Sequence, residues 1–350
     1  MELIKIGYNN KIKEQFEKAA KTNQIIGRIS LEHKRMYRVW AVFGELLCEV
    51  SGKLAFDAQS REEYPAVGDW VIVSPRKEER KGTITAILPR KSKFSRKVAG
   101  NNTEEQIVAA NVDTIFLVLS LNEDLNVRRL ERYLTLTWES GANPVIVLTK
   151  ADLAVDIKEK IMLVEGVSYG VPIVTISVVN NLGLDELQTY LLPGKTIALL
   201  GSSGVGKSTL TNYLIGFEKQ EVQEIRGSDA KGRHTTTNRE MVLLPNHAIL
   251  IDTPGMRELQ LWNSEDGISN SFSEIEPLSS SCKFRDCQHE KEIGCAVKLA
   301  IEKGELKEER LQSYKKLLRE LAFLERRQDK KAQSEEKKKW KNMTKQSKKR

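Results

Sequence analysis

One motif constrains the fold of this chain more than any other: a glycine-rich loop between an apolar strand and a helix. Residues 201–208 read Gly-Ser-Ser-Gly-Val-Gly-Lys-Ser and fill the pattern G-x-x-x-x-G-K-[ST]. They follow the apolar segment Ile197–Leu200 and open a predicted helix, Ser208–Ile215. Glycines let backbone N–H groups turn inward around phosphates at a helix N-terminus. The motif therefore predicts an α/β domain that binds a nucleotide.

Different residues of this loop are expected to contact different parts of the nucleotide. We expect Lys207 to place its charge on the β and γ phosphates and Ser208 to offer its hydroxyl to Mg²⁺. The expected nucleotide contacts of the loop and its first helical turn are Gly201, Ser202, Ser203, Gly204, Val205, Gly206, Lys207, Ser208 and Thr209.

Two later segments fit the switch regions of a nucleotide-dependent protein. Asp252 ends a buried strand and Gly255 follows it, so Asp252 would hold Mg²⁺ through water and the Gly255 N–H would meet a γ-phosphate. Between the loop and this segment lies Gly232–Thr237, from which Thr236 would complete the Mg²⁺ shell. Taken alone, Asp-x-x-Gly is a common strand-to-turn sequence, and the threonines could form a β-edge.

Recognition of guanine requires a carboxylate that accepts from the base. The candidate carboxylate precedes the phosphate loop in the chain. A predicted strand, Pro144–Leu148, runs into Thr149-Lys150-Ala151-Asp152. Asp152 would accept the N1–H and N2–H of guanine, and the Lys150 stem would cover the ring. Thr149 stands where an Asn is usual, which removes an amide that ties this loop to the phosphate loop. A second strand ends at Ser177, where the backbone could meet the guanine O6.

The chain order is therefore base loops first, then phosphate loop, then switches. Predicted strands alternate with amphipathic helices between residues 112 and 261, which indicates a parallel sheet with crossover helices. The predicted strands are Thr114–Leu119, Pro144–Leu148, Ile173–Ile176, Thr196–Leu200 and Ala248–Ile251. A parallel sheet fixes where its loops lie wherever the chain is cut, so a circularly permuted order still assembles one site. The part after Trp262 then follows the second switch directly, and loss of the γ-phosphate should move it.

Hydrolysis should be slow without a partner. The residue after Gly255, where a water-orienting Gln is common, is Met256, and a thioether cannot position a water as an amide can. His234 in the first switch is the nearest alternative group, and its competing interpretation is a surface histidine in a loop.

A compact group of cysteines and one histidine follows the predicted sheet. Cys282, Cys287, His289 and Cys295 fall within 14 residues, counted from 282 to 295 inclusive. Three thiolates and an imidazole suit tetrahedral Zn²⁺, and four protein ligands leave no open position, so we predict a structural site. The alternatives are a redox pair or buried free thiols. Cys48 stands alone and is simplest as a core residue.

The remaining features bound the class of protein. Segments between about residues 24 and 88 alternate in β fashion and predict a small β-barrel. No apolar run approaches the roughly 18 residues of a membrane span, the start lacks the order of a secretory signal, and four cysteines form no disulfide framework. We expect a cytoplasmic protein without a membrane partner. The net charge of +8 lies mainly in residues 326–350, which fit a phosphate-contacting arm or a frayed terminus.

Together these motifs resemble the RsgA family, also called YjeQ or YloQ, whose members are small-ribosomal-subunit-dependent, circularly permuted GTPases. The resemblance rests on the permuted order, on the phosphate loop, on Gly232–Thr237, on Asp252–Glu258 and on the Cys/His cluster. It covers residues 27–325, and Phe94–Lys97 leading to Ala109–Asp113 resembles the family's domain junction.

The resemblance implies a multidomain α/β architecture in three parts. These are an OB-fold β-barrel at 1–98, a circularly permuted P-loop GTPase domain at 99–264, and a mostly helical zinc-binding domain with a basic tail at 265–350. It implies Mg²⁺ with GTP, one structural Zn²⁺ per chain, and His234 as the catalytic residue. It further implies a monomer that binds the small (30S) subunit and its 16S rRNA late in assembly, with GTP hydrolysis stimulated by the subunit. Basic residues around Phe94 would fit rRNA contact or a solvated linker: Arg90, Lys91, Lys93, Arg96 and Lys97.

Two other functions fit parts of the sequence. Met256 leaves open an RNA-binding scaffold whose nucleotide site is a passive sensor with negligible turnover. An ATP-using P-loop enzyme would require Asp152 to be irrelevant to base selection.

Overall fold

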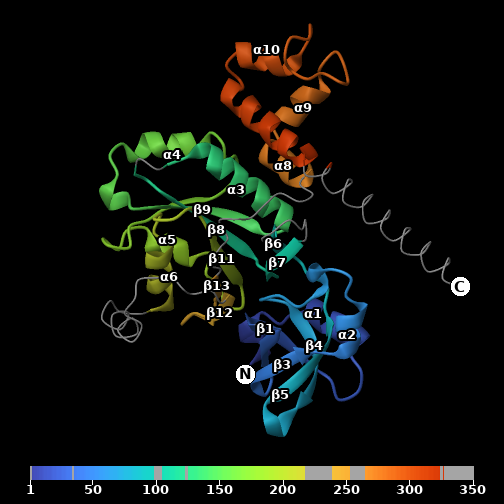
Figure 1. Cartoon of the computed structure of the whole chain (residues 1–350). Coiled ribbons are helices and arrows are strands. Elements are labelled where there is room, and N and C mark those ends of the chain that lie inside the picture. The colour runs from blue at the N-terminus through green and yellow to red at the C-terminus, as the bar shows by residue number, and fades with distance from the viewer. Residues whose placement is uncertain are drawn as a thin grey trace, which may run out of the picture. The chain divides into compact units, whose positions relative to one another are not determined.

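The computed structural model describes residues 2–33, 35–97, 105–122, 125–216, 239–252, 265–323 and 326. The chain divides into two compact units, Met1–Gln260 and Leu261–Arg350 (Figure 1). In the described residues the first unit carries the β-structure and the second is helical, and each is described by itself below.

A closed barrel forms the N-terminal part of the first unit (Figure 1, blue). Among the described residues five strands close in the order β1-β2-β3-β5-β4-β1, with β3 and β5 parallel and the other pairs antiparallel. The strands are β1 (Ile25–His33), β2 (Met36–Ala41), β3 (Gly44–Val50), β4 (Trp70–Arg76) and β5 (Lys81–Ile87). The predicted small barrel is thus confirmed, and its closure is that of an OB-like fold.

Alternating side chains explain why these segments form a barrel. In β2, Tyr37 and Val39 are buried whereas Met36 and Arg38 are exposed, which is the period of a strand with one face inward. The buried thiol of Cys48 packs in the same core, where burial raises its pKa to about 12. Cys48 is therefore a core residue, as predicted, and not a reactive thiol.

Short helices surround the barrel, and sequence periodicity did not reveal the first of them. They are η1 (Leu3–Ile6), α1 (Asn10–Ala19), α2 (Gly52–Asp57), η2 (Arg61–Glu63) and η3 (Lys77–Glu79). The side chain of Asn9 caps α1 by accepting from the Ile12 N–H.

The nucleotide-binding part of the first unit is a sheet with strand order β10-β9-β8-β11-β13-β12. Neighbouring pairs are parallel except β12–β13, which is antiparallel. The strands are β8 (Thr114–Ser120), β9 (Asn143–Thr149), β10 (Ile173–Thr175), β11 (Thr196–Leu200), β12 (Arg239–Leu243) and β13 (Ile249–Asp252). The helical elements are α3 (Val127–Ser140), η4 (Ala151–Leu153), α4 (Ile157–Glu165), α5 (Leu184–Gln188) and α6 (Lys207–Ile215).

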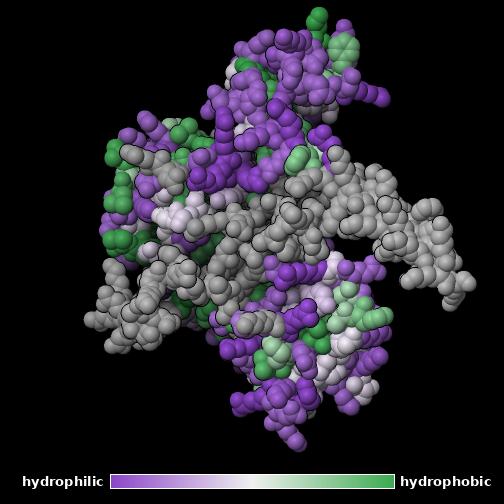
Figure 2. Space-filling view, viewed as in Figure 1, coloured by the Kyte–Doolittle hydropathy of each residue, from purple (hydrophilic) through white to green (hydrophobic). Residues whose placement is uncertain are grey.

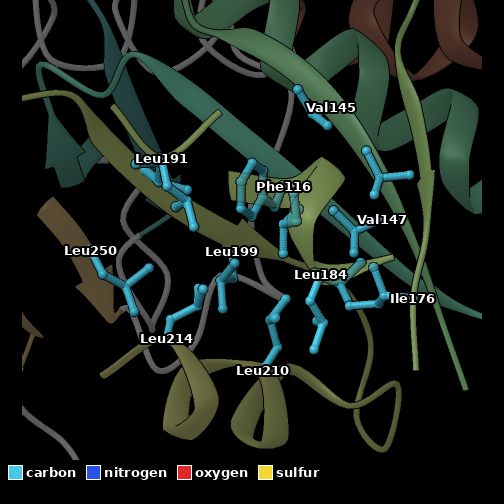
Figure 3. Packing of buried hydrophobic residues seen from close by; sticks show 14 of the residues in the cluster. Phe116, Val145, Val147, Ile176, Leu184, Leu191, Leu199, Leu210, Leu214 and Leu250 are labelled. Carbon is cyan, nitrogen blue, oxygen red and sulfur yellow. The ribbon is translucent and has the colours of Figure 1, made fainter. Parts of the chain in front are cut away.

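The core of this sheet is packed by residues that the sequence marks as strands and crossover helices. Leu210 and Leu214 of α6 point toward the sheet, where Leu199 and Leu250 meet them (Figure 3). All five predicted strands are present within two residues of their expected ends. The antiparallel β12 was not predicted.

The two sheets are continuous. Strand β12 pairs with the barrel strand β1, placing Leu31 opposite Glu240 and Glu32 opposite Arg239. A hairpin of β6 (Lys93–Lys97) and β7 (Glu105–Ala110) leads from the barrel into β8.

A group of polar side chains and one glycine lies where the barrel meets the amino ends of the parallel strands, and we call it the seam. Its members are buried except Arg90, which is half-buried. Its residues are Arg28, Gly68, Asp69, Arg90, Asn111 and Thr196. Arg28 is 2% exposed and donates to the backbone oxygens of Ile6, Gly68 and Asn111 and to Thr196 Oγ1. Burial lowers the pKa of Arg28 to about 10, so it remains charged at neutral pH.

Arg90 is the half-buried charge of the seam. Arg90 forms two 2.8 Å hydrogen bonds to the fully buried carboxylate of Asp69, and it also donates to backbone oxygens of Glu62 and Tyr64. These bonds do not fit a residue of a solvated linker, which was one expectation, while rRNA contact by this arginine stays a prediction. Lys91 and Lys93 have acidic partners at 2.5 Å, Asp113 and Glu62, while the side chains of Arg96 and Lys97 lie outside the described residues.

The C-terminal unit is helical in its described part, with α8 (Glu265–Ser271), α9 (Ile275–Ser280), α10 (Ala296–Glu302) and helical residues 308–323. Arg310 lies over the ring of buried Phe272, with 4.1 Å from its Cζ to the ring centroid, and donates to Glu274 at 2.6 Å. Tyr314 packs on the same ring. The mostly helical character expected of this part of the chain is confirmed, and the basic tail from 327 onward lies outside the described residues.

No helix within the described ranges has the length and apolarity that a membrane crossing requires. On the face seen in Figure 2 the described surface is mostly hydrophilic, with hydrophobic residues in small scattered groups. Scattered exposed apolar residues are normal for a folded domain and indicate no particular partner.

Candidate nucleotide site and metal-ligand cluster

The phosphate loop lies where the sequence placed it, between β11 and α6. Two glycines are required by the geometry. A Cβ on Gly201 would lie 2.3 Å from the carbonyl oxygen of Val118, and Gly206 has φ +96°, which L side chains rarely adopt. Helix α6 begins at Lys207, so its free N–H groups face the loop. The arrangement is an anion site made from backbone.

The loop lysine is held at one end of the loop. Lys207 Nζ donates to Gly201 O at 2.7 Å and also to Ser202 O. Ser208 and Thr209 follow it in the first turn of α6 and are exposed. The predicted phosphate and Mg²⁺ contacts that belong to residues 201–209 therefore lie at the carboxyl end of β11.

Thr149 stands in place of the usual Asn, which suggested that the tie to the phosphate loop is lost. The structure shows that the tie is kept. The Thr149 hydroxyl donates to Val205 O at 2.6 Å, and it lies 3.1 Å from Leu119 O. The side chain is buried, so water cannot substitute for this bond. A hydroxyl thus performs the tethering that was expected of an amide.

The two base loops are joined by their side chains. Ser177 Oγ donates to Asp152 Oδ1 at 2.5 Å, and Ser177 Oγ also accepts from the Asn180 N–H at 3.2 Å. The backbone adds a bond from the Ala151 N–H to Ile176 O at 3.2 Å. Lys150 adopts a left-handed conformation with φ +59°, which turns the chain at the end of β9. Asp152 is therefore held by a residue from the neighbouring strand's loop.

All these loops emerge at the same edge because β8, β9, β10, β11 and β13 run parallel. The base loops follow β9 and β10, the phosphate loop follows β11, and Asp252 is the last residue of β13. The described loops of the permuted chain order therefore meet at one edge of the sheet, whereas a complete nucleotide site there stays a prediction. His234, Thr236 and Gly255 lie outside the described residues, as does the side chain of Asp252.

One residue near the site was missed by sequence reasoning. Arg129, in the first turn of α3, donates from Nη1 to Ser202 Oγ at 2.6 Å. No motif marks it, because the contact depends on how α3 packs on β8 and β9. Its only sequence signal is a cation in a helix turn that contains no acid.

The predicted metal ligands converge in the C-terminal unit. The ligand atoms of Cys282, Cys287, His289 and Cys295 lie within 4.8 Å of one another. His289 Nδ1 is 3.6 Å from Cys282 Sγ and 3.4 Å from Cys295 Sγ, and these two sulfurs are 3.9 Å apart. Ligands about 2.0–2.3 Å from one tetrahedral ion lie about 3.5–3.8 Å apart, so the group could hold a metal ion.

Groups around the cluster support a ligand role for the histidine. The other ring nitrogen of His289, Nε2, lies 3.2 Å from Ser279 Oγ, which orients the ring with Nδ1 toward the sulfurs. The Glu292 carboxylate accepts from the backbone N–H groups of Gln288, Glu290 and Lys291 and so closes the turn after His289. The backbone N–H of Glu292 itself, together with these three, lowers the pKa of Glu292 to about 2.

Comparisons with known proteins agree with this geometry. The model of the family described as RsgA GTPase matches residues 87–262, and that described as 50S ribosome-binding GTPase matches residues 196–338. The small ribosomal subunit biogenesis GTPase RsgA 2 of Lactiplantibacillus plantarum is 50% identical in sequence, and the matched region covers 92% of this chain and 90% of that protein. RsgA 1 of Oceanobacillus iheyensis is 46% identical over 93% of both.

Two solved structures are similar across most of the chain. The crystal structure of YjeQ from Thermotoga maritima has a TM-score of 0.66 and 28% identity, covering 85% of this chain and 99% of that one. YloQ, titled a circularly permuted GTPase, has a TM-score of 0.62 and 26% identity, covering 87% of this chain and 97% of that one.

The fold and the permuted site define a circularly permuted P-loop GTPase with an OB-like barrel and a Cys₃His cluster. Within that class the chain belongs to the RsgA GTPase family. It is accordingly a GTP hydrolase, which excludes the ATP-using enzyme considered above.

Proposed function

We propose that this GTPase is a late assembly factor of the small ribosomal subunit that binds the subunit's 16S rRNA and is stimulated by it. The observation that carries this is the naming of relatives at 41–50% identity, each matched over more than nine tenths of this chain, as small ribosomal subunit biogenesis GTPases. An OB-like barrel, a recurrent platform for RNA, is consistent with it.

The deciding experiment measures GTP and ATP hydrolysis by the full chain alone, with isolated small subunits and with large subunits. We expect strong GTP turnover only with small subunits. The large-subunit arm matters because one matching family model is described as binding the 50S ribosome. Equal rates in all arms would overturn subunit dependence and favour a passive nucleotide sensor.

Within the site we propose that Asp152 selects guanine while Thr149, Lys150 and Ser177 shape the base loops. The buried Thr149 tether and the 2.5 Å Ser177–Asp152 bond support this assignment. Asp152→Asn should weaken GTP binding and improve binding of xanthosine triphosphate, whose base offers an oxygen where guanine offers an amino group. Unchanged preference for GTP over xanthosine triphosphate would contradict the role of Asp152.

For the phosphates we propose that residues 201–209 and the Gly255 N–H bind the nucleotide, with Mg²⁺ held by Ser208, Thr236 and Asp252. Support comes from the loop geometry and from the position of Asp252 at the end of β13, parallel to β11. Ser208→Ala should raise the Mg²⁺ concentration needed for half-maximal GTP binding. No change in that concentration would remove Ser208 from the shell.

We propose His234 as the catalytic residue for hydrolysis. The support is its position in the first switch beside Thr236, together with Met256 at the place of a water-orienting amide. His234→Ala should abolish most subunit-stimulated turnover without weakening GTP binding, whereas His33→Ala on the exposed barrel surface should not. If His234→Ala retains subunit-stimulated GTP turnover, another residue is the catalytic one.

For the cluster of Cys282, Cys287, His289 and Cys295 we propose one structural Zn²⁺ per chain. The donor set and the 3.4–3.9 Å spacings suit tetrahedral zinc, and four ligands leave no position for substrate. Metal analysis should find one zinc per chain, and a strong chelator should unfold the C-terminal unit, seen as lost helical signal. A different stoichiometric metal, or none, would contradict this.

Finally we propose a cytoplasmic monomer that acts through three domains, 1–98, 99–264 and 265–350. Ribosomal subunits assemble in the cytoplasm, and the barrel, the nucleotide site and the Cys₃His cluster each fall within one of these ranges. Light scattering of the purified chain should give a mass near 39.7 kDa. A dimer mass would contradict the monomer.

A further inference from the structure

Arg129 contacts the phosphate loop from another part of the domain. Its guanidinium Nη1 donates to the hydroxyl of Ser202 at 2.6 Å, across 73 residues of sequence. The bond links a charged donor to a loop hydroxyl, and charge-assisted hydrogen bonds are the stronger kind. Helix α3, which carries Arg129, starts shortly after β8, the neighbour of β11 in the sheet.

The backbone of Arg129 is fixed where it can reach the loop. Asn126 caps α3, and its Oδ1 accepts from the Arg129 N–H at 3.0 Å. The first turn of α3 has no acidic residue, and cations at this end oppose the helix macrodipole. The stability of α3 therefore does not account for an arginine at this position.

The contact falls at a particular end of the loop. Lys207 Nζ, the group that reaches β and γ phosphates in such loops, donates to the backbone oxygens of Gly201 and Ser202. The other end of the loop leads into the N-terminus of α6. Ser202 thus borders the γ-phosphate side of the loop, which a bound GDP would leave without a phosphate.

We propose that Arg129 is a positioning residue for GTP hydrolysis that holds the γ-phosphate side of the phosphate loop through the Ser202 hydroxyl. The proposal rests on the nucleotide site assigned above. Because the bond acts on the γ-phosphate side, Arg129 discriminates GTP from GDP and supports turnover more than it supports nucleotide binding in general.

The test compares Arg129→Ala with Arg128→Ala, which removes the adjacent and exposed arginine of the same helix turn. The measurements are the affinities for GDP and for a non-hydrolysable GTP analogue, together with single-turnover GTP hydrolysis. We expect Arg129→Ala to keep GDP affinity within about twofold and to lower analogue affinity and hydrolysis about tenfold, the usual size of a lost charge-assisted bond. Arg128→Ala should match the unmodified chain.

A double-mutant cycle tests whether Arg129 acts through the Ser202 hydroxyl. Ser202→Ala should reproduce the Arg129→Ala effect, and the double variant should be no worse than either single variant. Arg129→Lys should recover part of the hydrolysis rate, because it keeps the charge but not the planar guanidinium.

The outcomes separate this inference from the proposed nucleotide site. If the unmodified chain bound neither GDP nor the analogue, the site and the role of Arg129 would both be wrong. If it bound both, equal loss of GDP and analogue affinity in Arg129→Ala would indicate a structural role, and additive effects of the two substitutions would exclude Ser202. Either result, or Arg129→Ala behaving as Arg128→Ala does, overturns the proposal.

Discussion

The two ends of the same parallel strands are held together by different physics. At the carboxyl ends, hydroxyl groups link the loops: Thr149 to Val205 O, Ser177 to Asp152, and Ser202 to Arg129. At the amino ends, the seam is held by buried charges, Arg28 and the Asp69–Arg90 pair. Single hydroxyl bonds let loops adjust to a ligand, whereas a buried charge is costly to leave unpaired. The contrast predicts that substitutions in the seam reduce mainly stability, and that substitutions in the loops reduce mainly nucleotide binding.

The largest effect should come from breaking the buried pair in the seam. Arg90→Ala leaves the Asp69 carboxylate buried without its partner and should lower the free energy of unfolding by about 3–5 kcal/mol. Urea denaturation of the full chain measures this. Arg76→Ala, which removes an exposed arginine with acids at 3.7 and 3.9 Å, should cost less than about 1 kcal/mol.

The same variant has a pH signature. Burial raises the pKa of Asp69, and the Arg90 hydrogen bonds and charge oppose that rise. Without Arg90 the folded-state pKa should exceed the unfolded value further, so folding takes up a proton and stability increases as pH falls. Arg90→Ala should therefore be less destabilised at pH 5 than at pH 8. A pH-independent loss would show that the charge of Asp69 is not the cause.

At the other edge, losing the Thr149 tether should affect the ligand more than the fold. Thr149→Val keeps the shape but leaves Val205 O without its donor, which should weaken guanine nucleotide binding about twofold to tenfold. Thr149→Asn supplies an amide donor and should bind nearly as well as the unmodified chain. If Thr149→Val binds guanine nucleotide as tightly as the unmodified chain, the Thr149–Val205 bond does not support nucleotide binding.

A smaller change is expected from Ser177→Ala. The variant frees Asp152 from its donor, so the carboxylate is less well oriented for a base, and GTP affinity should fall a few-fold with little change in urea midpoint. Thr189→Ala removes an exposed hydroxyl beyond α5 and serves as the control. An equal decrease of GTP affinity in Ser177→Ala and Thr189→Ala would indicate an effect of α5 packing rather than of Asp152 orientation.

The smallest effect concerns an outlying ion pair near the seam. Burial alone would raise the pKa of Asp113, but Lys91, the Thr196 N–H and Lys195 lower it below 3.8 overall. A lowered pKa means that this carboxylate adds stability above its unfolded pKa and loses it as pH falls through the folded value. Lys91 is 45% exposed, so Lys91→Ala should cost under about 1 kcal/mol at pH 7 and nothing at pH 2. A loss that persists at pH 2 would contradict an electrostatic origin.

Sequence patterns predicted the parallel strands and the barrel because each depends on local periodicity. Thr196–Leu200 is one such strand, found at its expected bounds. They did not reveal β12, whose sequence gives no sign that it would pair antiparallel with β13 and then with β1. Nor did they reveal Arg28, whose partner Thr196 is 168 residues away. Thr149 shows the same limit, since its residue type suggested a lost tether and its hydroxyl supplies one.

By itself the sequence determined the residue types on which the proposed chemistry rests: a lysine and glycines for phosphates, an aspartate for a base, and thiolates with an imidazole for a metal ion. Those functions depend on residue type and short spacing, which the chain order states directly. The tertiary structure alone decided which side chains hold these groups in place, as Arg129 holds Ser202 and Arg28 holds the seam. Such contacts join residues far apart in sequence, and only the packing of the sheet brings them within bonding distance.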